Sequence, residues 1–182
     1  MLLQFFKTSI IFVTKWLHFI NLSYPNFNLT TMNNTNDLSQ RTLRIQRTFS
    51  APVQLVWEAW SKPEHITQWW GPKNMETSVI EHNFQVGGKW HYSMKMPDGN
   101  SFIAEGIYSV IEALRRIVSS ANFKPMTEGV EMQVLFEAQG ERQTQMTFNM
   151  IHPTAEYCKQ QEQMGFYKGW ASVFDRLEAF FD

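Results

Sequence analysis

One segment constrains the fold of this chain more than any other: residues 50–72 read SAPVQLVWEAWSKPEHITQWWGP. Ser50 can cap a helix that carries Pro52 in its first turn, where the missing amide donor costs nothing. Ser61 and Pro63 repeat this start signal, and a glycine–proline pair ends the second helix. The segment therefore predicts two short helices joined by a tight turn. Four tryptophans lie on them: Trp57, Trp60, Trp69 and Trp70.

The composition fits one globular domain in a reducing, cytoplasmic environment. The chain has 182 residues, of which 43% are hydrophobic and 15% aromatic, enough to bury a sizeable core. Its formal net charge of -1 gives no reason to expect a nucleic acid or an anionic membrane as a partner. Cys158 is the only cysteine, which excludes an internal disulfide framework.

Residues 1–31 differ from the rest of the sequence. They carry Lys7 and Lys15 but no acidic residue, and the apolar run between these lysines is short. No small-residue cleavage motif follows, as a secretory signal would require, and a membrane helix would have to hold both lysines. We expect an upstream extension, with translation starting at Met32; a signal or an anchor is the alternative. Residues 32–40 have the composition of a polar linker.

The remainder, residues 41–182, is predicted to be one folded domain. Apolar and polar residues alternate in several segments, as expected for strands with one buried face. These segments are 42–49, 76–83, 89–96, 101–111, 116–122, 130–137 and 146–150. Because short turns separate them, we expect an antiparallel sheet with one face toward water.

A long helix is predicted to follow the strands, starting at Pro153 and Thr154. One face of this helix is mostly apolar: Gln163, Phe166, Trp170, Val173, Phe174, Leu177 and Phe181. That stripe must be buried, and the inner face of the sheet is the only large apolar surface available to it. The predicted fold class is therefore α+β, with a curved antiparallel sheet gripping a long C-terminal helix and two short helices between the first and second strands.

Five motifs in this order resemble a known family. They are Ala51-Pro52 with Val56-Trp57, Pro63-Glu64-His65 with Trp69-Trp70-Gly71-Pro72, Val86-Gly87-Gly88-Lys89-Trp90, Asp98-Gly99, and Gly169-Trp170 followed by Leu177. The chain resembles the helix-grip superfamily of steroidogenic-acute-regulatory, polyketide-cyclase and birch-pollen-allergen-like domains. Within it, the chain is similar to the branch named after the activator of the ninety-kilodalton heat-shock chaperone's ATPase. The resemblance implies a cavity between the sheet and the last helix that suits an apolar ligand.

The alternation places methionines and aromatic residues toward that interior. Methionine fills irregular space and is common at adaptable binding surfaces, although the same residues could simply form an ordinary core. We take the candidate ligand-binding residues to be Trp69, Trp90, Tyr92, Met94, Tyr108, Met132, Phe136, Phe148, Met150, Gln163, Phe166 and Trp170. Of the adjacent pair Trp69 and Trp70, about 100° apart on a helix, we expect Trp69 to line the cavity.

The sequence offers no convincing catalytic or metal-binding set. The strand pattern places Glu131, Glu137 and His91 on the outer face, and no carboxylate pair is evident. The histidines have no cysteine or acid at metal-ligand spacing, so neither a metal nor another cofactor is expected. Cys158 is interpreted as an inert buried residue.

The favoured hypothesis is therefore a domain that binds a small hydrophobic or aromatic molecule without catalysis. Two alternatives remain open: an interaction protein acting on a heat-shock chaperone, and a cyclase- or hydrolase-type enzyme that uses Tyr92 or Tyr108 as a proton donor. No nucleic acid is expected as a partner, and no membrane for the folded domain. The oligomeric state is left open.

Overall fold

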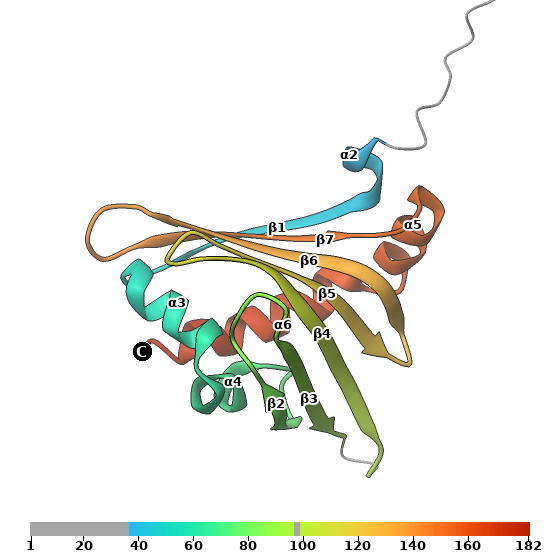
Figure 1. The fold of residues 1–182 in the computed structure, drawn as a ribbon, viewed down its shortest axis with the longest axis horizontal. Coiled ribbons are helices and arrows are strands. Elements are labelled where there is room, and N and C mark those ends of the chain that lie inside the picture. Colours follow the sequence, from blue (N-terminus) through green and yellow to red (C-terminus); the bar gives the residue numbers. More distant parts are fainter. Residues whose placement is uncertain (1–36, 97–98) are drawn as a thin grey trace, which may run out of the picture. The chain divides into compact units, whose positions relative to one another are not determined.

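The computed structural model describes residues 37–96 and 99–182, and these form one curved sheet with five helices (Figure 1). The strands are β1 (Thr42–Phe49), β2 (Glu76–His82), β3 (Lys89–Lys95), β4 (Ser101–Glu112), β5 (Arg116–Lys124), β6 (Thr127–Ala138) and β7 (Thr144–Ile151). The helices are α2 (Leu38–Arg41), α3 (Val53–Ser61), α4 (Pro63–Trp69), α5 (Ala155–Gln163) and α6 (Phe166–Ala179). The predictions for residues 1–36 lie outside the described residues.

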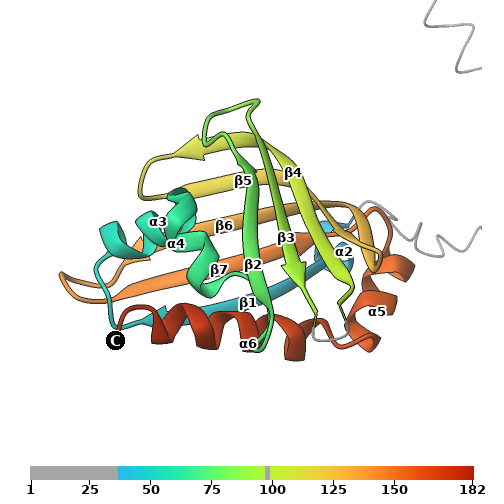
Figure 2. The ribbon, with the colours of Figure 1, turned by 90° about the horizontal axis from the view of Figure 1, so that it is seen from below.

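The seven strands are antiparallel and have the order β1-β7-β6-β5-β4-β3-β2. All neighbours are therefore consecutive in the chain except β1, which pairs with β7. The sheet curves around α6, with α3 and α4 at one end and α5 at the other (Figures 1 and 2). The predicted α+β helix-grip fold is confirmed.

Both short helices form where predicted, but they begin later than their serines indicate. Pro52, with ψ near 150°, is the residue that precedes α3, and its carbonyl accepts hydrogen bonds from the amides of Leu55 and Val56. Ser50 is exposed and does not cap the helix. Ser61 ends α3 instead of starting α4, because Lys62 adopts an extended conformation and Pro63 takes the first helical position.

The predicted long terminal helix is divided into α5 and α6. Its start is as expected, since the hydroxyl of Thr154 accepts a hydrogen bond from the amide of Tyr157 at 3.1 Å. Gly165, with φ of 100°, then interrupts the helix in a left-handed conformation that a side chain would disfavour. The sequence predicts one continuous helix face from Gln163 to Phe181. The part of this prediction that precedes Gly165, in α5, is therefore wrong.

The core lies between α6 and the inner face of the sheet. Val173, Phe174 and Leu177 of α6 are buried and belong to one apolar cluster with inward residues of the strands and tryptophans of α3 and α4. Full burial of such side chains contributes about 2 kcal/mol each. This packing fixes α6 against the sheet and forms the surroundings of the cavity described below.

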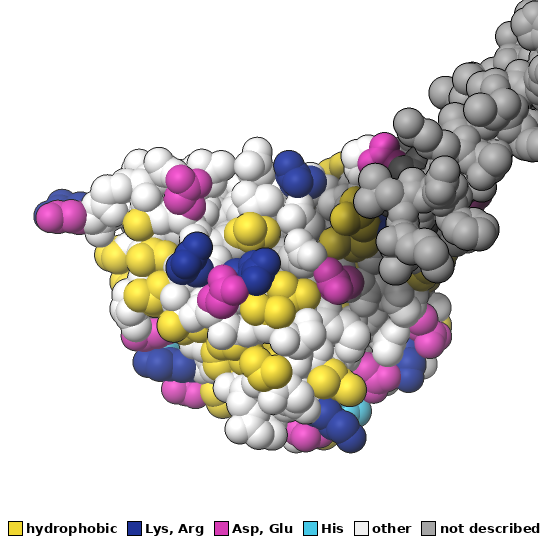
Figure 3. Space-filling model, turned by 45° about the horizontal axis from the view of Figure 1, so that its top comes forward, with side chains coloured by type: hydrophobic (Ala, Val, Ile, Leu, Met, Phe, Trp, Pro, Cys, Tyr) yellow, Lys and Arg dark blue, Asp and Glu magenta, His cyan; other side chains and the backbone are white. Residues whose placement is uncertain are grey.

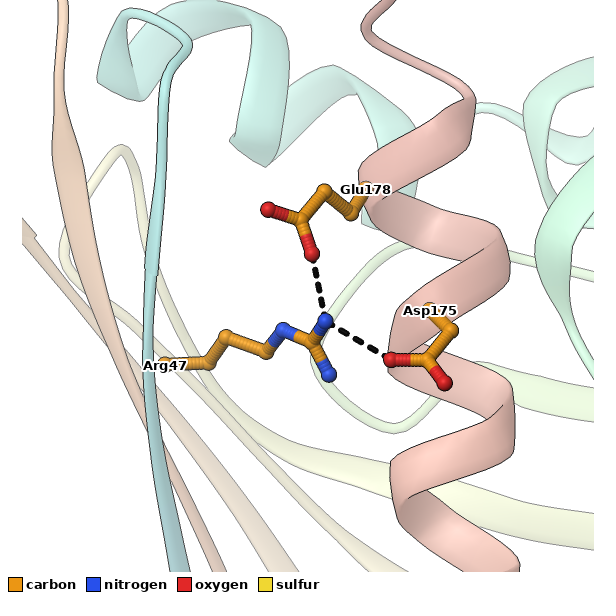
Figure 4. Close-up of polar contacts among 3 residues, drawn as sticks. All are labelled: Arg47, Asp175 and Glu178. Carbon is orange, nitrogen blue, oxygen red and sulfur yellow. Dashed lines mark hydrogen bonds and ion pairs between the residues drawn. The ribbon is translucent and has the colours of Figure 1, made fainter.

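A pair of acids on α6 also connects this helix to the first strand. Arg47 of β1 reaches toward α6, where its Nη2 contacts Asp175 at 2.7 Å and also the carboxylate of Glu178 (Figure 4). Desolvation acts to lower the pKa of Arg47, but its bonds to Glu178 and Asp175 outweigh this and raise it. The contact therefore joins the edge strand β1 to helix α6.

The outer face of the sheet is mixed in character. It carries exposed apolar side chains, such as Ile107 of β4 and Leu135 of β6, on the same strands as the ion-paired Glu105 and the exposed Glu131. In Figure 3 the hydrophobic side chains of the displayed face lie between charged and polar ones. Scattered apolar residues of this kind are ordinary on a protein surface.

Candidate functional site: an apolar cavity beside α6

A cavity of about 240 Å³ lies between α6 and the inner face of the sheet. It is lined by residues from the loop after α4, from strands β3 to β7 and from both terminal helices. These residues are Trp70, Gly71, Pro72, Met75, Met94, Met96, Phe102, Phe123, Met126, Thr127, Met150, His152, Gln161, Met164, Gly165, Phe166, Gly169, Trp170 and Val173. The rim includes the half-exposed side chains of Met126 and Met164.

The lining is apolar and adaptable. It contains six methionines and five aromatic residues, and no charged side chain occurs among the described residues that form it. Phe123 and Trp170 meet edge to face, with ring centroids 5.6 Å apart, and Trp70 packs against Trp170 in the same way at 5.8 Å. Flexible thioethers beside fixed aromatic rings form a surface that can adjust to the shape of a ligand.

Three polar side chains interrupt this lining, all near α5. His152 follows β7, and its Nδ1 lies 3.2 Å from the carbonyl oxygen of Arg41. Thr127 begins β6, and its hydroxyl donates to Oε1 of Gln161 at 2.5 Å, while Nε2 of Gln161 donates to the Met126 carbonyl at 3.2 Å. His152 is 1% exposed and Gln161 6% exposed, so both are buried. Burial lowers the pKa of His152, which keeps the imidazole neutral near pH 7.

Arg176 of α6 holds the loop that forms one wall of the cavity. Its Nη1 lies 3.2, 3.0, 3.2 and 3.4 Å from the carbonyl oxygens of Trp70, Gly71, Pro72 and Met75, which share its two hydrogens. Desolvation lowers the pKa of this guanidinium, and no carboxylate pairs with it in the described part of the chain. The guanidinium is therefore hydrogen-bonded to backbone carbonyls instead of a carboxylate, and these bonds position the loop that forms the wall.

Comparison with known proteins identifies the family. Residues 50–182 match the family described as Activator of Hsp90 ATPase homolog 1-like protein. The chain belongs to this family. The resemblance found in the sequence motifs is therefore confirmed, and so is the relation to the helix-grip superfamily. The comparison with curated proteins gives no match.

Solved structures similar to this family member come from several bacteria. A solution NMR structure from Arthrobacter aurescens has a TM-score of 0.72 and 25% sequence identity, covering 79% of this chain and 87% of that one. A crystal structure from Mycobacterium smegmatis has a TM-score of 0.69 and 25% identity, covering 80% and 93%. A third, from Nitrosomonas europaea, has a TM-score of 0.67 and 25% identity, covering 78% and 94%. These similarities support the fold.

The predicted ligand-binding residues divide into three groups in this family member. Four of them line the cavity: Met94, Met150, Phe166 and Trp170. Four others are buried around a separate void of about 10 Å³, too small for any ligand: Trp90, Tyr92, Tyr108 and Met132. The remaining four line neither space: Trp69, Phe136, Phe148 and Gln163.

The expectation that Trp69 lines the cavity is wrong. Trp69 is fully buried, and its indole donates a hydrogen bond to the Ala59 carbonyl at 2.9 Å. Trp70 lines the cavity in its place. The reason is that Trp70 has already left the helix, with φ of -63° and ψ of 136°, so helical spacing does not describe where it points.

The expectation for Gln163 is also wrong, because its side chain is exposed near the end of α5. Gln161, two residues earlier, is the buried glutamine that lines the cavity. Sequence analysis also missed His152 and Thr127. His152 could have been found by extending the alternation of Met146, Phe148 and Met150 by one step, since it has the same parity along the chain.

Tyr92 and Tyr108 belong to a polar cluster with His82 that lies apart from the cavity. The hydroxyl of Tyr92 is 2.7 Å from Nδ1 of His82, whose Nε2 lies 2.9 Å from the Ser61 carbonyl oxygen. Burial raises the pKa values of Tyr92 and Tyr108 well above the ordinary value for tyrosine. Neither hydroxyl lines the 240 Å³ cavity, so neither is placed to donate a proton to a ligand bound there.

Other kinds of site receive little support. Among the described residues, no group of three or more His, Cys, Asp and Glu side chains could hold a metal ion. Burial raises the pKa of the Cys158 thiol, which makes this cysteine a weaker nucleophile. None of the helices in the described ranges is long and apolar enough to cross a membrane.

Proposed function

We propose that this protein binds a small, predominantly apolar or aromatic molecule in the cavity beside α6. The observation that carries the proposal is a cavity of about 240 Å³ whose described lining has no charged side chain. An engineered apolar cavity of about 150 Å³ accepts benzene, so this volume suits a molecule of roughly ten non-hydrogen atoms. A fused bicyclic aromatic compound has this size.

The mouth of the cavity supports the same proposal. Met126 and Met164 are half-exposed at its rim, and Gly169 of α6, an exposed residue, also belongs to the lining. A Cβ atom added to Gly169 would have no heavy atom within 4 Å. The glycine leaves open space at this side of the helix, and we propose that a ligand enters there.

A blocking variant tests the proposal. Indole and benzofuran are titrated into the full chain by calorimetry, and protein purified from its own host is analysed by native mass spectrometry for a retained molecule. Gly169→Phe should abolish binding of both compounds, because its ring would occupy the mouth. Lys168→Phe is the matched control, since Lys168 is exposed and does not line the cavity. Failure of both compounds to bind, or equal binding by Gly169→Phe, would refute the proposal.

The family description supports a second candidate, stimulation of a heat-shock chaperone ATPase. Only membership of the family supports this candidate. This is weak support, because similar folds serve many functions. The purified chain is added to the ninety-kilodalton chaperone of its host, and ATP hydrolysis is followed. An unchanged rate at saturating concentration would remove this candidate.

A cytoplasmic location of the protein stays a prediction.

A further inference from the structure

Two of the six methionines that line the cavity are accessible from outside. Met126, in the turn between β5 and β6, is 49% exposed, and Met164, which follows α5, is 50% exposed. Met94 and Met150 of the same lining are 2% and 1% exposed. Because a dissolved oxidant must reach a thioether to react with it, the two methionines at the rim should be oxidised well before these inner two.

The sulfur of Met164 lies next to an amide donor. Nε2 of Gln161 donates one hydrogen to the Met126 carbonyl at 3.2 Å, and the sulfur of Met164 lies 4.0 Å from the same nitrogen. A thioether is a weak acceptor, so the second hydrogen of this amide has a weak partner. Gln161 is 6% exposed, and its Oε1 accepts a hydrogen bond from the hydroxyl of Thr127. The amide is therefore held in a fixed orientation beside the sulfur.

Met126 provides an internal comparison. It is as exposed as Met164 and also lines the cavity. Within the described ranges, however, only its backbone takes part in hydrogen bonds, and its sulfur has no amide donor beside it. A chemical change at the Met126 sulfur therefore has no partner that would hold it at the mouth.

We propose that Met164 is a site of reversible oxidation by a peroxide, and that this oxidation weakens ligand binding in the cavity. A lone pair of the sulfur attacks one oxygen of hydrogen peroxide, and the O–O bond breaks. The proton of the transferred oxygen moves to the departing hydroxide, which leaves as water. The sulfur is oxidised by two electrons to a sulfoxide, and the peroxide is reduced. The effect on binding rests on the proposed function, whereas the oxidation itself does not.

The sulfoxide oxygen gives the Gln161 amide a strong acceptor. Because this oxygen can lie between the sulfur and Nε2, the separation of 4.0 Å leaves room for a hydrogen bond of about 2.9 Å. The bond holds the Met164 side chain at the mouth and places a polar group where the lining had an apolar one. An apolar ligand would have to displace water from this group, so its affinity should fall.

Peroxide treatment of the full chain tests the oxidation site. Samples taken over time are digested, and the peptides are mapped by mass for the gain of one oxygen atom. Met126 and Met164 should be oxidised about tenfold faster than Met94 and Met150, or more, because of their exposure. Equal rates for Met164 and the two inner methionines would overturn the proposal.

Side-chain amide spectra test the new hydrogen bond. In nitrogen-15 correlation spectra, one amide hydrogen of Gln161 should shift downfield when the wild type or Met126→Leu is oxidised. It should not shift in Met164→Leu, which lacks the sulfur. Both substituted side chains are half-exposed, so both variants should fold as the wild type does. A shift that persists in Met164→Leu would assign the effect to another residue and overturn the bond.

Calorimetric titration with benzofuran, which has no hydrogen-bond donor, tests the effect on binding. The oxidised wild type and oxidised Met126→Leu should bind benzofuran about tenfold more weakly than their untreated forms. Reduction by a methionine sulfoxide reductase should restore the affinity. Met164→Leu is the decisive variant, since its affinity should not change on peroxide treatment. An equal loss in this variant would overturn the role of Met164.

The outcomes distinguish this inference from the function on which it rests. Unchanged affinity of the oxidised wild type would overturn the effect on binding and leave the binding function intact. If the untreated wild type does not bind benzofuran, the proposed function fails for this compound, and the effect on binding fails with it. The peptide map and the amide spectra would still decide whether Met164 is the oxidised residue and whether Gln161 bonds to it.

Discussion

Arg176 of α6 donates a hydrogen bond from Nη2 to the carbonyl oxygen of Gln68, 2.8 Å away near the end of α4. The same guanidinium donates from Nη1 to the loop that follows, which includes Gly71 and Pro72 of the cavity wall. Helix α6, around which the sheet curves, is thus connected to the segment of α3 and α4 through hydrogen bonds to backbone carbonyls. Because the carbonyls are at the C-terminal end of α4, the cation also interacts favourably with the helix dipole.

Removal of this guanidinium should destabilise both the fold and the cavity. For Arg176→Met we expect the free energy of unfolding to fall by about 3 kcal/mol, since hydrogen bonds to charged groups are stronger than neutral ones. Arg176→Lys should restore only part of it, because an ammonium cannot match the planar fork of donors. Urea unfolding and indole titration measure the two effects. Arg142→Met, at an exposed arginine, is the control and should change stability by less than about 0.5 kcal/mol.

Two glycines should respond oppositely to the same added methyl group. A Cβ on Gly106 of β4 would lie 1.9 Å from the Ser120 carbonyl oxygen and 2.7 Å from the Trp90 indole, so Gly106→Ala should cost about 3 kcal/mol or more. A Cβ on Gly169 of α6 meets nothing within 4 Å, so Gly169→Ala should stabilise the helix by about 0.5–1 kcal/mol. Urea unfolding compares both with the wild type. Similar changes in the two variants would contradict the packing described for β4.

The alternation of apolar and polar residues was sufficient to predict the sheet, because the two faces of a strand are a local property of the chain. It also identified Trp90 and Tyr92 correctly as inward-facing. Whether an inward residue lines an open space is decided elsewhere, by how α4 and α6 pack over it. Trp90 and Tyr92 surround a void of about 10 Å³, whereas Met94, the next inward residue on the same strand, borders the cavity.

The terminal helices show a second reason why the site was only partly predictable. The apolar pattern predicts one unbroken helix that extends from Phe166 back past Gln163. The left-handed Gly165 changes the direction of the chain between α5 and α6, so Gln161 is buried and Gln163 is exposed. The predicted helix contains two glycines, Gly165 and Gly169, and only Gly165 takes the left-handed conformation that ends a helix, so the sequence alone does not show where the break lies.

The ion pair between β1 and α6 should contribute modestly and should depend on salt. The Arg47 side chain is 25% exposed, whereas those of Asp175 and Glu178 are 67% and 47% exposed (Figure 4). Arg47→Met should therefore cost only about 0.5–1 kcal/mol at low salt. The loss should shrink in about 1 M NaCl, where charges are screened within about 3 Å. Lys159→Met, at an exposed lysine of α5, is the matched control. A loss that does not depend on salt would indicate a packing effect.

Stability should also decrease on mild acidification because of His82. Its Nδ1 accepts from the Tyr92 hydroxyl, its Nε2 donates to the Ser61 carbonyl, and burial lowers its pKa. The folded protein therefore binds a proton less readily than the unfolded chain, whose histidines titrate near pH 6.5. By linkage, the free energy of unfolding is highest above about pH 6.5 and falls as the pH drops toward the lowered pKa. His152, whose pKa burial also lowers, acts in the same direction.

The contribution of His82 is isolated by comparing two variants in urea unfolding between about pH 7.5 and pH 5.5. One histidine can add at most about 1.4 kcal/mol per pH unit to the slope. His82→Gln removes the titrating group and should flatten the curve, whereas Tyr92→Phe should lower stability while keeping the slope, because His82 stays buried. The pKa values of the Glu58 and Glu105 carboxyls are lowered from 4.5, so these groups titrate below this window. A His82→Gln curve parallel to that of the wild type would show that another group is responsible.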